Sequence, residues 1–201
     1  MCFFLRLVYS SVLKTEAFRR HGSPGTILVE ERSGAVAKKL RIGVLSDTHL
    51  HQVTRTFEAI LDRYLSEVDV LFHVGDFTSP RIVDYLGTRD FYGVCGNMDP
   101  PEIRTQLPVK RVVELGGLRF GLIHGWGSSE DLEERVLESF SNVDAVVYGH
   151  SHKAVSRIRG GVLVFNPGTA CGPSKNGFHS VGMLECEGDV VRGEIVQVDG
   201  S

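Results

Sequence analysis

Residues 40–49 read Leu-Arg-Ile-Gly-Val-Leu-Ser-Asp-Thr-His, a largely apolar run that ends in polar side chains. Such a short apolar run is long enough for a β-strand but too short for most helices. Residues 53–65 then place apolar side chains at helical spacing, which predicts an amphipathic helix. The stretch therefore predicts the first β-α unit of an α/β fold, with Asp47 and His49 directly after its strand.

The same alternation continues through the first half of the chain. Residues 69–74 and 90–95 have the composition of buried strands, and residues 80–86 predict a short helix. Pro80 would stand in the first turn of that helix, where a proline is tolerated because its missing N–H has no helical partner. Two further strand ends are thus predicted, one before Asp76 and one before Asn97.

The second half is richer in strands. Residues 109–115 and 118–123 flank Gly116-Gly117 and predict a β-hairpin. A helix is predicted over residues 128–140, because acidic side chains gather early in it, where the helix dipole favours them. Further strands are predicted over residues 145–148, 154–158, 162–165, 180–186 and 190–198. β-α units followed by strand-rich hairpins predict an α/β fold whose sheets carry helices on their outer faces.

Composition limits the classes of function. The chain has 201 residues, with 42% hydrophobic and 23% charged side chains, which is typical of one soluble globular domain. Its net charge of −3 argues against extended nucleic-acid binding, although a local basic patch remains compatible with it. The four cysteines stand far apart, so we expect reduced thiols in a cytoplasmic protein and no cysteine-ligated zinc.

The first 39 residues differ from the rest. Residues 1–13 are apolar but interrupted by Arg6, and they are too short to span a bilayer and lack the charged start of a signal peptide. Residues 21–39 are rich in glycine, serine and charge and have no sustained period. We expect residues 1–39 to be a poorly ordered or loosely docked extension of a domain over 40–201, without membrane association. Docking of the apolar segment on the domain is the alternative.

Polar side chains follow five of the predicted strands. Ligand sites in open α/β sheets form beyond the carboxyl ends of the strands, so these side chains are expected at one rim. They are Asp47 and His49 after the first strand, Asp76, Asn97, His124 after the hairpin, and His150 and His152.

All seven side chains can bind a metal ion. Carboxylate, imidazole and amide ligands together suit Mn²⁺, Fe²⁺, Zn²⁺ or Ni²⁺ better than Ca²⁺. Seven ligands are too many for one tetrahedral ion, but they suffice for two ions with positions left for water and substrate. Two such ions, roughly 3.5–4 Å apart, can generate hydroxide and hold both oxygens of an in-line displacement at phosphorus.

Each residue also has an ordinary structural explanation when taken alone. Asp47 and Asp76 could cap the helices that follow them. Asn97 could be a turn residue, and the histidines could be core or exposed turn side chains. These explanations must all hold independently, whereas a metal site explains the set together.

In order and spacing, these residues resemble the signature of the calcineurin-like metallophosphoesterases. The matching motifs are Asp47-Thr48-His49, Gly75-Asp76, Gly96-Asn97, His124-Gly125 and Gly149-His150-Ser151-His152. The resemblance runs from Leu40 to about Val198. Asn166-Pro167-Gly168-Thr169 also resembles a turn of the family's small prokaryotic phosphodiesterase branch. The resemblance implies a four-layer α-β-β-α sandwich with metals at one edge of the paired sheets.

The resemblance also implies roles for the seven residues. One metal would be held by Asp47, His49, Asp76 and His152, and the other by Asp76, Asn97, His124 and His150. Asp76 would bridge two divalent ions, most often Mn²⁺, with Ni²⁺, Fe²⁺ or Zn²⁺ as alternatives. A hydroxide between them would attack a small phosphate-ester substrate, and Asp76, Asn97 and His124 would form the catalytic centre.

One residue departs from the family pattern. Many members have a histidine directly after the equivalent of Asn97, where it assists the leaving group, but this chain has Met98. Because methionine cannot donate a proton, we expect good turnover only of activated esters, or protonation by metal-bound water. Asp99 could orient His124 or a water, or serve in a turn, and Trp126 could form a wall of the substrate pocket or simply pack.

Two other classes of function compete with this interpretation. A non-catalytic metal-binding scaffold, or protein-interaction module, could use the same fold, but this chain keeps every expected ligand. A serine hydrolase is disfavoured because Lys153 stands where the nucleophile motif around Ser151 needs its second glycine. Exposed hairpin strands could in addition pair two copies as a homodimer.

Overall fold

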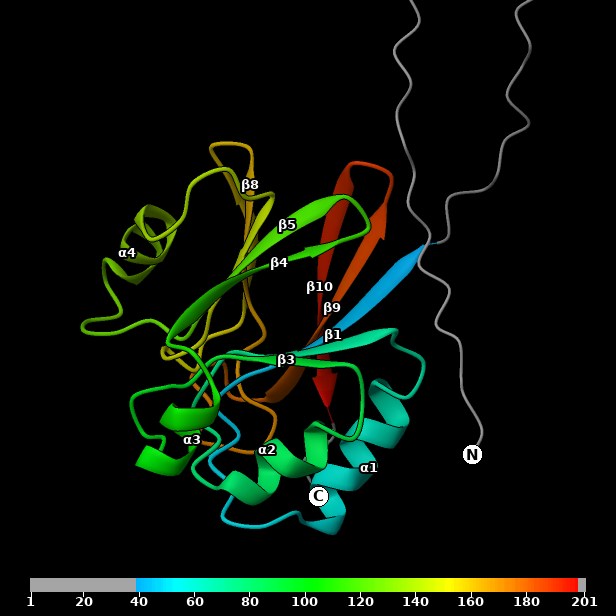
Figure 1. Cartoon of the computed structure of the whole chain (residues 1–201), viewed down its shortest axis with the longest axis vertical. Helices are drawn as coiled ribbons and strands as arrows, with labels where there is room; N and C mark the ends of the chain where they lie inside the picture. The colour runs from blue at the N-terminus through cyan, green and yellow to red at the C-terminus, as the bar shows by residue number, and fades with distance from the viewer. Residues whose placement is uncertain (1–38, 199–201) are drawn as a thin grey trace, which may run out of the picture. The chain divides into compact units, whose positions relative to one another are not determined.

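The first of two β-sheets begins with the strand that opens the sequence pattern. Its strands are β1 (Leu40–Leu45), β2 (Val70–His73), β3 (Phe91–Gly93), β9 (His179–Glu187) and β10 (Val190–Val198). They lie in the order β10-β9-β1-β2-β3 in the computed structural model, which describes residues 39–198 (Figure 1). β1, β2 and β3 run parallel, and β2 is buried along its whole length, as expected for a strand covered on both faces.

The second sheet has the same size and also contains three parallel strands. Its strands are β4 (Lys110–Leu115), β5 (Leu118–Ile123), β6 (Ala145–Val147), β7 (Val155–Arg159) and β8 (Val162–Asn166). They are ordered β4-β5-β6-β8-β7, with β5, β6 and β8 parallel and the two edge strands antiparallel to their neighbours. Since β5 and β6 are parallel, their carboxyl ends lie at one edge, where His124 and His150 follow.

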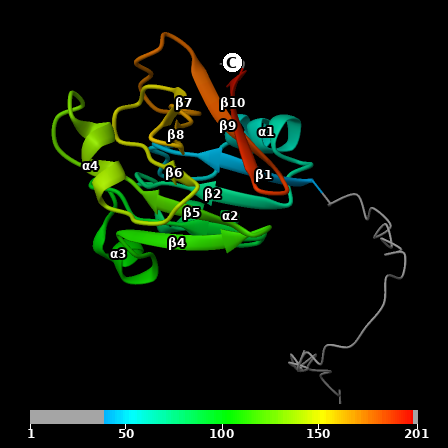
Figure 2. The ribbon, with the colours of Figure 1, turned by 90° about the horizontal axis from the view of Figure 1, so that it is seen from above.

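Four helices cover the outer faces. They are α1 (Arg55–Tyr64), α2 (Pro80–Leu86), α3 (Pro101–Gln106) and α4 (Leu132–Glu138). One core lies between the sheets and includes Phe72, Phe120 and Phe165. A second core packs α1, α2 and α3 on the first sheet, and a third packs α4 on the second. Figure 2 shows α4 and α1 on opposite sides of the sheets, so the predicted four-layer α-β-β-α sandwich is confirmed.

The predicted elements agree with the structure except at two helices. The strands and α1 differ from their predicted bounds by at most two residues at either end, and α2 matches. α4 begins at Leu132 rather than at residue 128, because residues 128–131 belong to a loop held by Arg135. α3 was not predicted; it begins at Pro101, in the first helical turn, where proline is tolerated.

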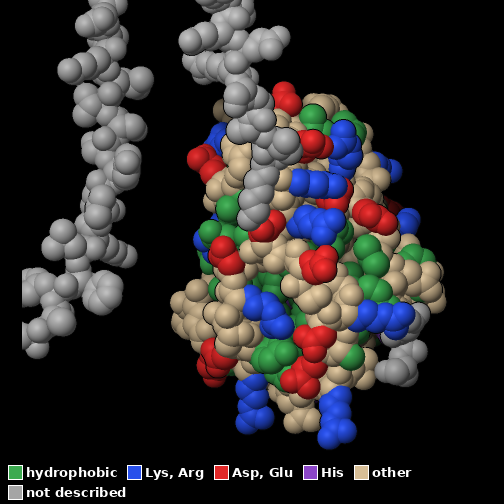
Figure 3. Space-filling model, turned by 90° about the vertical axis from the view of Figure 1, so that its right-hand side faces the viewer, with side chains coloured by type: hydrophobic (Ala, Val, Ile, Leu, Met, Phe, Trp, Pro, Cys, Tyr) green, Lys and Arg blue, Asp and Glu red, His purple; other side chains and the backbone are tan. Residues whose placement is uncertain are grey.

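The face over α1 and the β1 end of the first sheet carries both signs of charge. Figure 3 shows basic and acidic side chains interspersed there, around smaller hydrophobic areas. Lys39 Nζ lies 2.6 Å from Glu185, and Arg41 contacts both Glu185 and Glu67. Within residues 39–198, none of the helices is long and apolar enough to cross a membrane. The predicted extension covers residues 1–39, of which 1–38 lie outside the described part of the chain, and it stays a prediction.

Candidate metal centre

The loops after β1 and β2 stay paired beyond the ends of their strands. The N–H of Asp47 donates to the carbonyl oxygen of Gly75 at 3.0 Å, and that of His49 donates to Asp76 at 3.1 Å. Backbone pairing therefore sets the first two candidate ligands beside the third. Asp47 and Asp76 do not cap the following helices, because α1 is capped by Thr54 and α2 begins after Ser79.

The backbone is strained at the candidate residues. Seven non-glycine residues in the described chain have a positive φ, and five of them belong to the predicted set. They are Asp47, His49, Asp76, His150 and His152. L-residues rarely adopt this conformation, and where it persists it clusters at functional sites, because the surrounding structure enforces it. The strain thus marks these loops independently of their side-chain chemistry.

Two glycines of the predicted motifs leave room for the carboxylates. A Cβ atom on Gly96 would lie 2.1 Å from Oδ1 of Asp76, and one on Gly149 would lie 2.7 Å from Oδ2 of Asp47. Both distances are far below van der Waals contact. The glycines therefore allow the backbone of two other loops to close directly over the acidic side chains.

Asp47 lies at the centre of the first group of ligands. Its Oδ1 atom is 3.2 Å from Nε2 of His152 and 3.9 Å from Nε2 of His49. The two Nε2 atoms lie 3.2 Å apart. The ligand atoms of these three residues all lie within 4.8 Å of one another, which is close enough for one metal ion.

The second group combines both carboxylates with His124, and all three are buried. Nε2 of His124 lies 3.3 Å from Oδ2 of Asp76 and 3.9 Å from Oδ1 of Asp47. Oδ2 of Asp76 is also 3.8 Å from His49, so this carboxylate lies between the two groups. Oδ1 of Asp47 and Nε2 of His124 are buried without a well-aligned hydrogen bond. Buried polar atoms in proteins normally have a hydrogen-bond partner. These two atoms therefore indicate a site for a positively charged partner.

His150 and Asn97 face each other at the outer side of the centre. Nε2 of His150 donates to the carbonyl oxygen of Gly127 at 2.9 Å. In the neutral ring Nδ1 is then an acceptor, and it lies 2.9 Å from the amide oxygen of Asn97. Two acceptors at this distance are stabilised by a shared cation.

Carbonyl oxygens orient two further histidines. Nδ1 of His124 donates to Val74 at 2.7 Å, and Nδ1 of His152 donates to Pro173 at 2.6 Å. A histidine that ligates a metal typically donates its other ring N–H in this way, which fixes the tautomer and the ring. Both Nε2 atoms are thereby presented to the carboxylates.

The carboxylates create a field that favours cations. Burial disfavours charge on His124, but Asp76 and Asp47 outweigh it and raise the pKa of the ring. The hydrogen-bond contact with Asp47 raises the pKa of His152 against a smaller effect of burial. Burial would raise the pKa of Asp76, yet His124 and the N–H of Met98 lower it on balance. Oxygen and nitrogen lone pairs therefore converge in a negative field, and the chemistry of the residues fits divalent metal ions.

Three side chains that the ligand pattern did not identify support these loops. Oγ1 of Thr169 donates to the carbonyl oxygen of Asp47 at 2.8 Å, and the amide of Asn166 donates to that of Gly149 at 2.9 Å. Thr169 and Asn166 both belong to the turn that resembles the small prokaryotic branch. That resemblance was the signal in the sequence that could have identified them. Asp99 accepts the N–H groups of Asp76, Thr78 and Gly96, so it has the turn role rather than contacting His124.

A family model for the calcineurin-like phosphoesterase superfamily domain matches residues 40–189, which contain all seven candidate ligands. The chain belongs to this superfamily. A probable metallophosphoesterase of Methanocaldococcus jannaschii is 35% identical over 139 residues, which are 66% of this chain and 69% of that protein. The family assignment and the named phosphoesterase relatives agree with the resemblance drawn from the sequence.

Solved structures agree with the superfamily fold. An archaeal phosphodiesterase is 28% identical, with a TM-score of 0.62 over 78% of this chain and all of that chain. Vps29 of Entamoeba histolytica, solved with zinc, is 24% identical, with a TM-score of 0.61 over 79% of this chain and 99% of that chain. The second likeness shows the fold alone.

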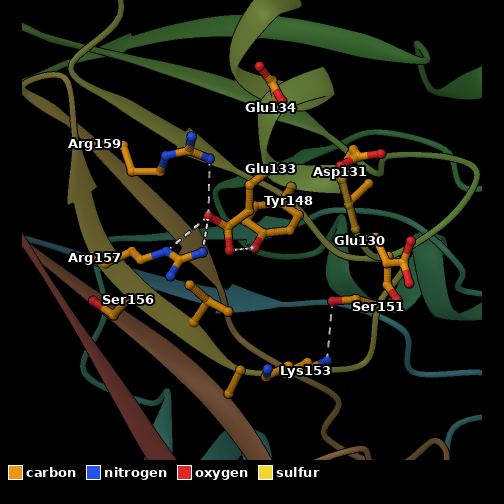
Figure 4. A pocket seen from close by; sticks show the side chains of 14 residues that line it. Glu130, Asp131, Glu133, Glu134, Tyr148, Ser151, Lys153, Ser156, Arg157 and Arg159 are labelled. Atoms are coloured by element: carbon orange, nitrogen blue, oxygen red, sulfur yellow. Dashed lines mark hydrogen bonds and ion pairs between the residues drawn. The ribbon is translucent and has the colours of Figure 1, made fainter.

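A hollow of about 630 Å³ lies beside the loop that carries His150 and His152, but none of the seven residues lines it. Figure 4 shows Glu133 of α4 between Arg157 and Arg159 of β7. Glu133 accepts from Nε of Arg157 at 2.9 Å and from the hydroxyl of Tyr148 at 3.3 Å. Glu133 engages both arginines, and its contacts join α4 to β7.

Proposed function

We propose that this phosphoesterase hydrolyses phosphodiesters at two divalent metal ions, with attack on phosphorus by a hydroxide shared between them. The observation that carries the proposal is the pair of buried atoms, Oδ1 of Asp47 and Nε2 of His124, without a well-aligned hydrogen bond in the middle of the candidate ligands. Divalent ions bound there would activate a water molecule and neutralise charge on the phosphoryl oxygens.

The residues divide into two sets of ligands in this proposal. Asp47, His49 and His152 hold one ion, and Asn97, His124 and His150 hold the other. Asp76 belongs to both sets, as the family resemblance implies. Its Oδ2 atom lies 3.8 Å from His49 and 3.3 Å from His124, while Oδ1 of Asp47 also lies 3.9 Å from each of these rings. Oxygen and nitrogen ligands without thiolate favour Mn²⁺, with Ni²⁺, Fe²⁺ or Zn²⁺ as alternatives.

The leaving group has no acid from the protein at the expected place. Met98 follows Asn97 and is 60% exposed, so its side chain is accessible but carries no proton to donate. Its N–H donates to Oδ1 of Asp76 at 2.8 Å, and this contact does not depend on the side chain. Phosphodiesters with good leaving groups are therefore the preferred substrates.

A metal-binding scaffold is the second candidate function, because the fold is shared with Vps29. The fixed histidines around two carboxylates fit metal binding in both functions, so metal binding alone does not separate them. The two functions differ in one measurable respect. A scaffold would bind metal without turning over any phosphate ester.

The test is hydrolysis of bis-p-nitrophenyl phosphate by protein stripped of metal and then supplied with Mn²⁺. We expect activity that requires Mn²⁺ and is lost in Asp76→Asn and His124→Ala. Asp84→Asn is the matched control, because it makes the same charge change at an exposed position of α2 and should retain activity. Absence of turnover in wild-type protein with Mn²⁺ demonstrably bound would overturn the proposal in favour of the scaffold.

A further inference from the structure

A second hollow, of about 220 Å³, opens directly beside the candidate metal centre. Two of its lining residues belong to the proposed ligands and most of the others are apolar. Its main lining residues are Asn97, His124, Trp126, Val109, Ile123 and Arg104. An apolar cavity of about 150 Å³ is enough to hold a benzene ring. The hollow is thus large enough for one aromatic ring attached to a phosphate at the centre.

Two large apolar side chains at this hollow, Trp126 and Val109, are exposed. Trp126 is 49% exposed and Val109 is 69% exposed, and Met98, next to Asn97 in the chain, is 60% exposed. Among residues 39–198, only one other large hydrophobic side chain, Ile158 at 62%, is at least as exposed as Trp126. Large apolar side chains gathered beside a polar site mark a binding surface more often than isolated ones do.

The position of Trp126 is tied to the candidate ligands. Its carbonyl oxygen accepts from Nη2 of Arg135 at 2.8 Å, and the next residue, Gly127, accepts from Nε2 of His150 at 2.9 Å. The loop is therefore fixed on one side by α4 and on the other by a proposed ligand. The backbone that carries the indole therefore keeps its place relative to the candidate metal centre.

Arg104 also lines this hollow. Its Nε donates to the carbonyl oxygen of Asp99 and its Nη2 to that of Asn97, both at 2.8 Å. These contacts hold the loop of Asn97 and leave a positive charge at the edge of the hollow. A positive edge next to an apolar wall suits a ligand that combines an anionic phosphate with a ring.

We propose that this hollow, walled by Trp126, binds an aromatic group esterified to the substrate phosphate, so that the enzyme prefers aryl or nucleoside-like phosphodiesters. This inference rests on the proposed function, because it takes Asn97 and His124 as part of the reacting centre. Stacking on an aromatic side chain holds rings of many kinds, so Trp126 selects the class rather than one compound.

The experiment uses two non-hydrolysable probes, phenylphosphonate and methylphosphonate, which differ only in the ring. Trp126 is the only tryptophan of the chain, so the intrinsic fluorescence of Mn²⁺-loaded protein reports on this wall alone. We expect phenylphosphonate to change the tryptophan emission and to bind about tenfold more tightly than methylphosphonate. Equal affinity, or an emission that does not respond to the ring, would overturn the proposal.

Variants distinguish the contribution of the wall to probe binding from that of the candidate metal centre. The ratio of the two inhibition constants against bis-p-nitrophenyl phosphate should fall to about twofold in Trp126→Ala and recover in Trp126→Phe. Val109→Ser keeps Trp126, so the affinities for the two probes can also be measured by fluorescence. The ratio of these affinities should fall in this variant as well. Ile158→Ala, exposed on β7 away from this hollow, is the control and should keep the wild-type ratio.

The two proposals fail in different ways. If wild-type protein shows no Mn²⁺-dependent hydrolysis, the proposed function is wrong. If hydrolysis occurs but Trp126→Ala leaves the ratio unchanged, only the aromatic subsite is wrong. An unchanged ratio together with an altered oligomeric state of Trp126→Ala would assign the exposed side chains to contact between copies instead.

Discussion

Nδ1 of His124 donates a hydrogen bond of 2.7 Å to the carbonyl oxygen of Val74. The carbonyl oxygen can only accept, so the proton of the neutral ring is on Nδ1 and Nε2 carries a lone pair. Val74 directly follows β2, and the bond therefore reaches from the first sheet to a residue that follows the second. This hydrogen bond between the two sheets thus sets which ring nitrogen of His124 faces the carboxylates.

Replacement of His124 should separate metal binding from folding. We expect His124→Ala to lower Mn²⁺ affinity by more than about 100-fold, because even the loss of a residue that only supports a ligand costs 10–100-fold. His124→Gln places an amide near the position of Nε2 and should retain part of the affinity. Calorimetric titration with Mn²⁺ measures both. Wild-type affinity in His124→Ala would contradict its role as a ligand, and the exposed His51→Ala serves as control.

The stability of metal-free protein should depend on pH through its histidines. The pKa values of His124 and His152 are raised above the ordinary histidine value of 6.5, so their contribution is complete below 6.5 and is lost as pH rises through the folded values. Burial lowers the pKa of His73, so protonation of the unfolded chain destabilises the fold below 6.5. Stability should therefore rise as pH falls toward 6.5 and decline below it.

Bound Mn²⁺ should reverse the dependence of stability on pH above 6.5. Metal binding requires deprotonated ligands and stabilises only the folded chain, so stability should then increase with pH above 6.5. Thermal unfolding in chelator and in Mn²⁺, over about pH 5 to 9, measures both profiles. Identical profiles with and without metal would contradict binding at these histidines.

Local patterns predicted the strands and the candidate ligands that follow them, but not the contacts that hold these side chains in place. Strand ends can be predicted because apolar runs are short and polar residues follow them directly, as at Asp47 and His124. The left-handed backbone of His49 could not be predicted, since it depends on pairing with the loop of Asp76. The bond from Thr169 to Asp47 spans 122 residues and has no periodic signal.

Thr169 should matter for metal binding although it is not one of the candidate ligands. It is buried, donates to the carbonyl oxygen of Asp47, and accepts the N–H of Gly172 at 2.8 Å. Thr169→Val keeps the shape and leaves both groups unsatisfied, so unfolding should become easier by about 1–3 kcal/mol. Mn²⁺ affinity should fall by about 10–100-fold.

The matched control for this substitution is Thr88→Val. Thr88 also donates to a carbonyl oxygen, that of Tyr85, at 2.7 Å, but it is exposed and water can replace the bond. Chemical denaturation and metal titration of both variants provide the comparison. Equal losses in the two variants would mean that Thr169 does not support the loop of Asp47.

Met98→His should add the acid that the leaving group lacks. The side chain of Met98 is 60% exposed, and its N–H keeps its bond to Asp76 whatever the side chain, so the substitution should not disturb the fold. General acid catalysis contributes about 10²–10⁴-fold where a proton is needed, so kcat/KM for alkyl esters should rise by at least about tenfold. p-Nitrophenolate leaves without a proton, and its esters should gain little.

The comparison of alkyl and p-nitrophenyl diesters, with Met98→Gln as control, measures this difference. An equal gain for both ester classes would show that the histidine acts on binding rather than on the leaving group.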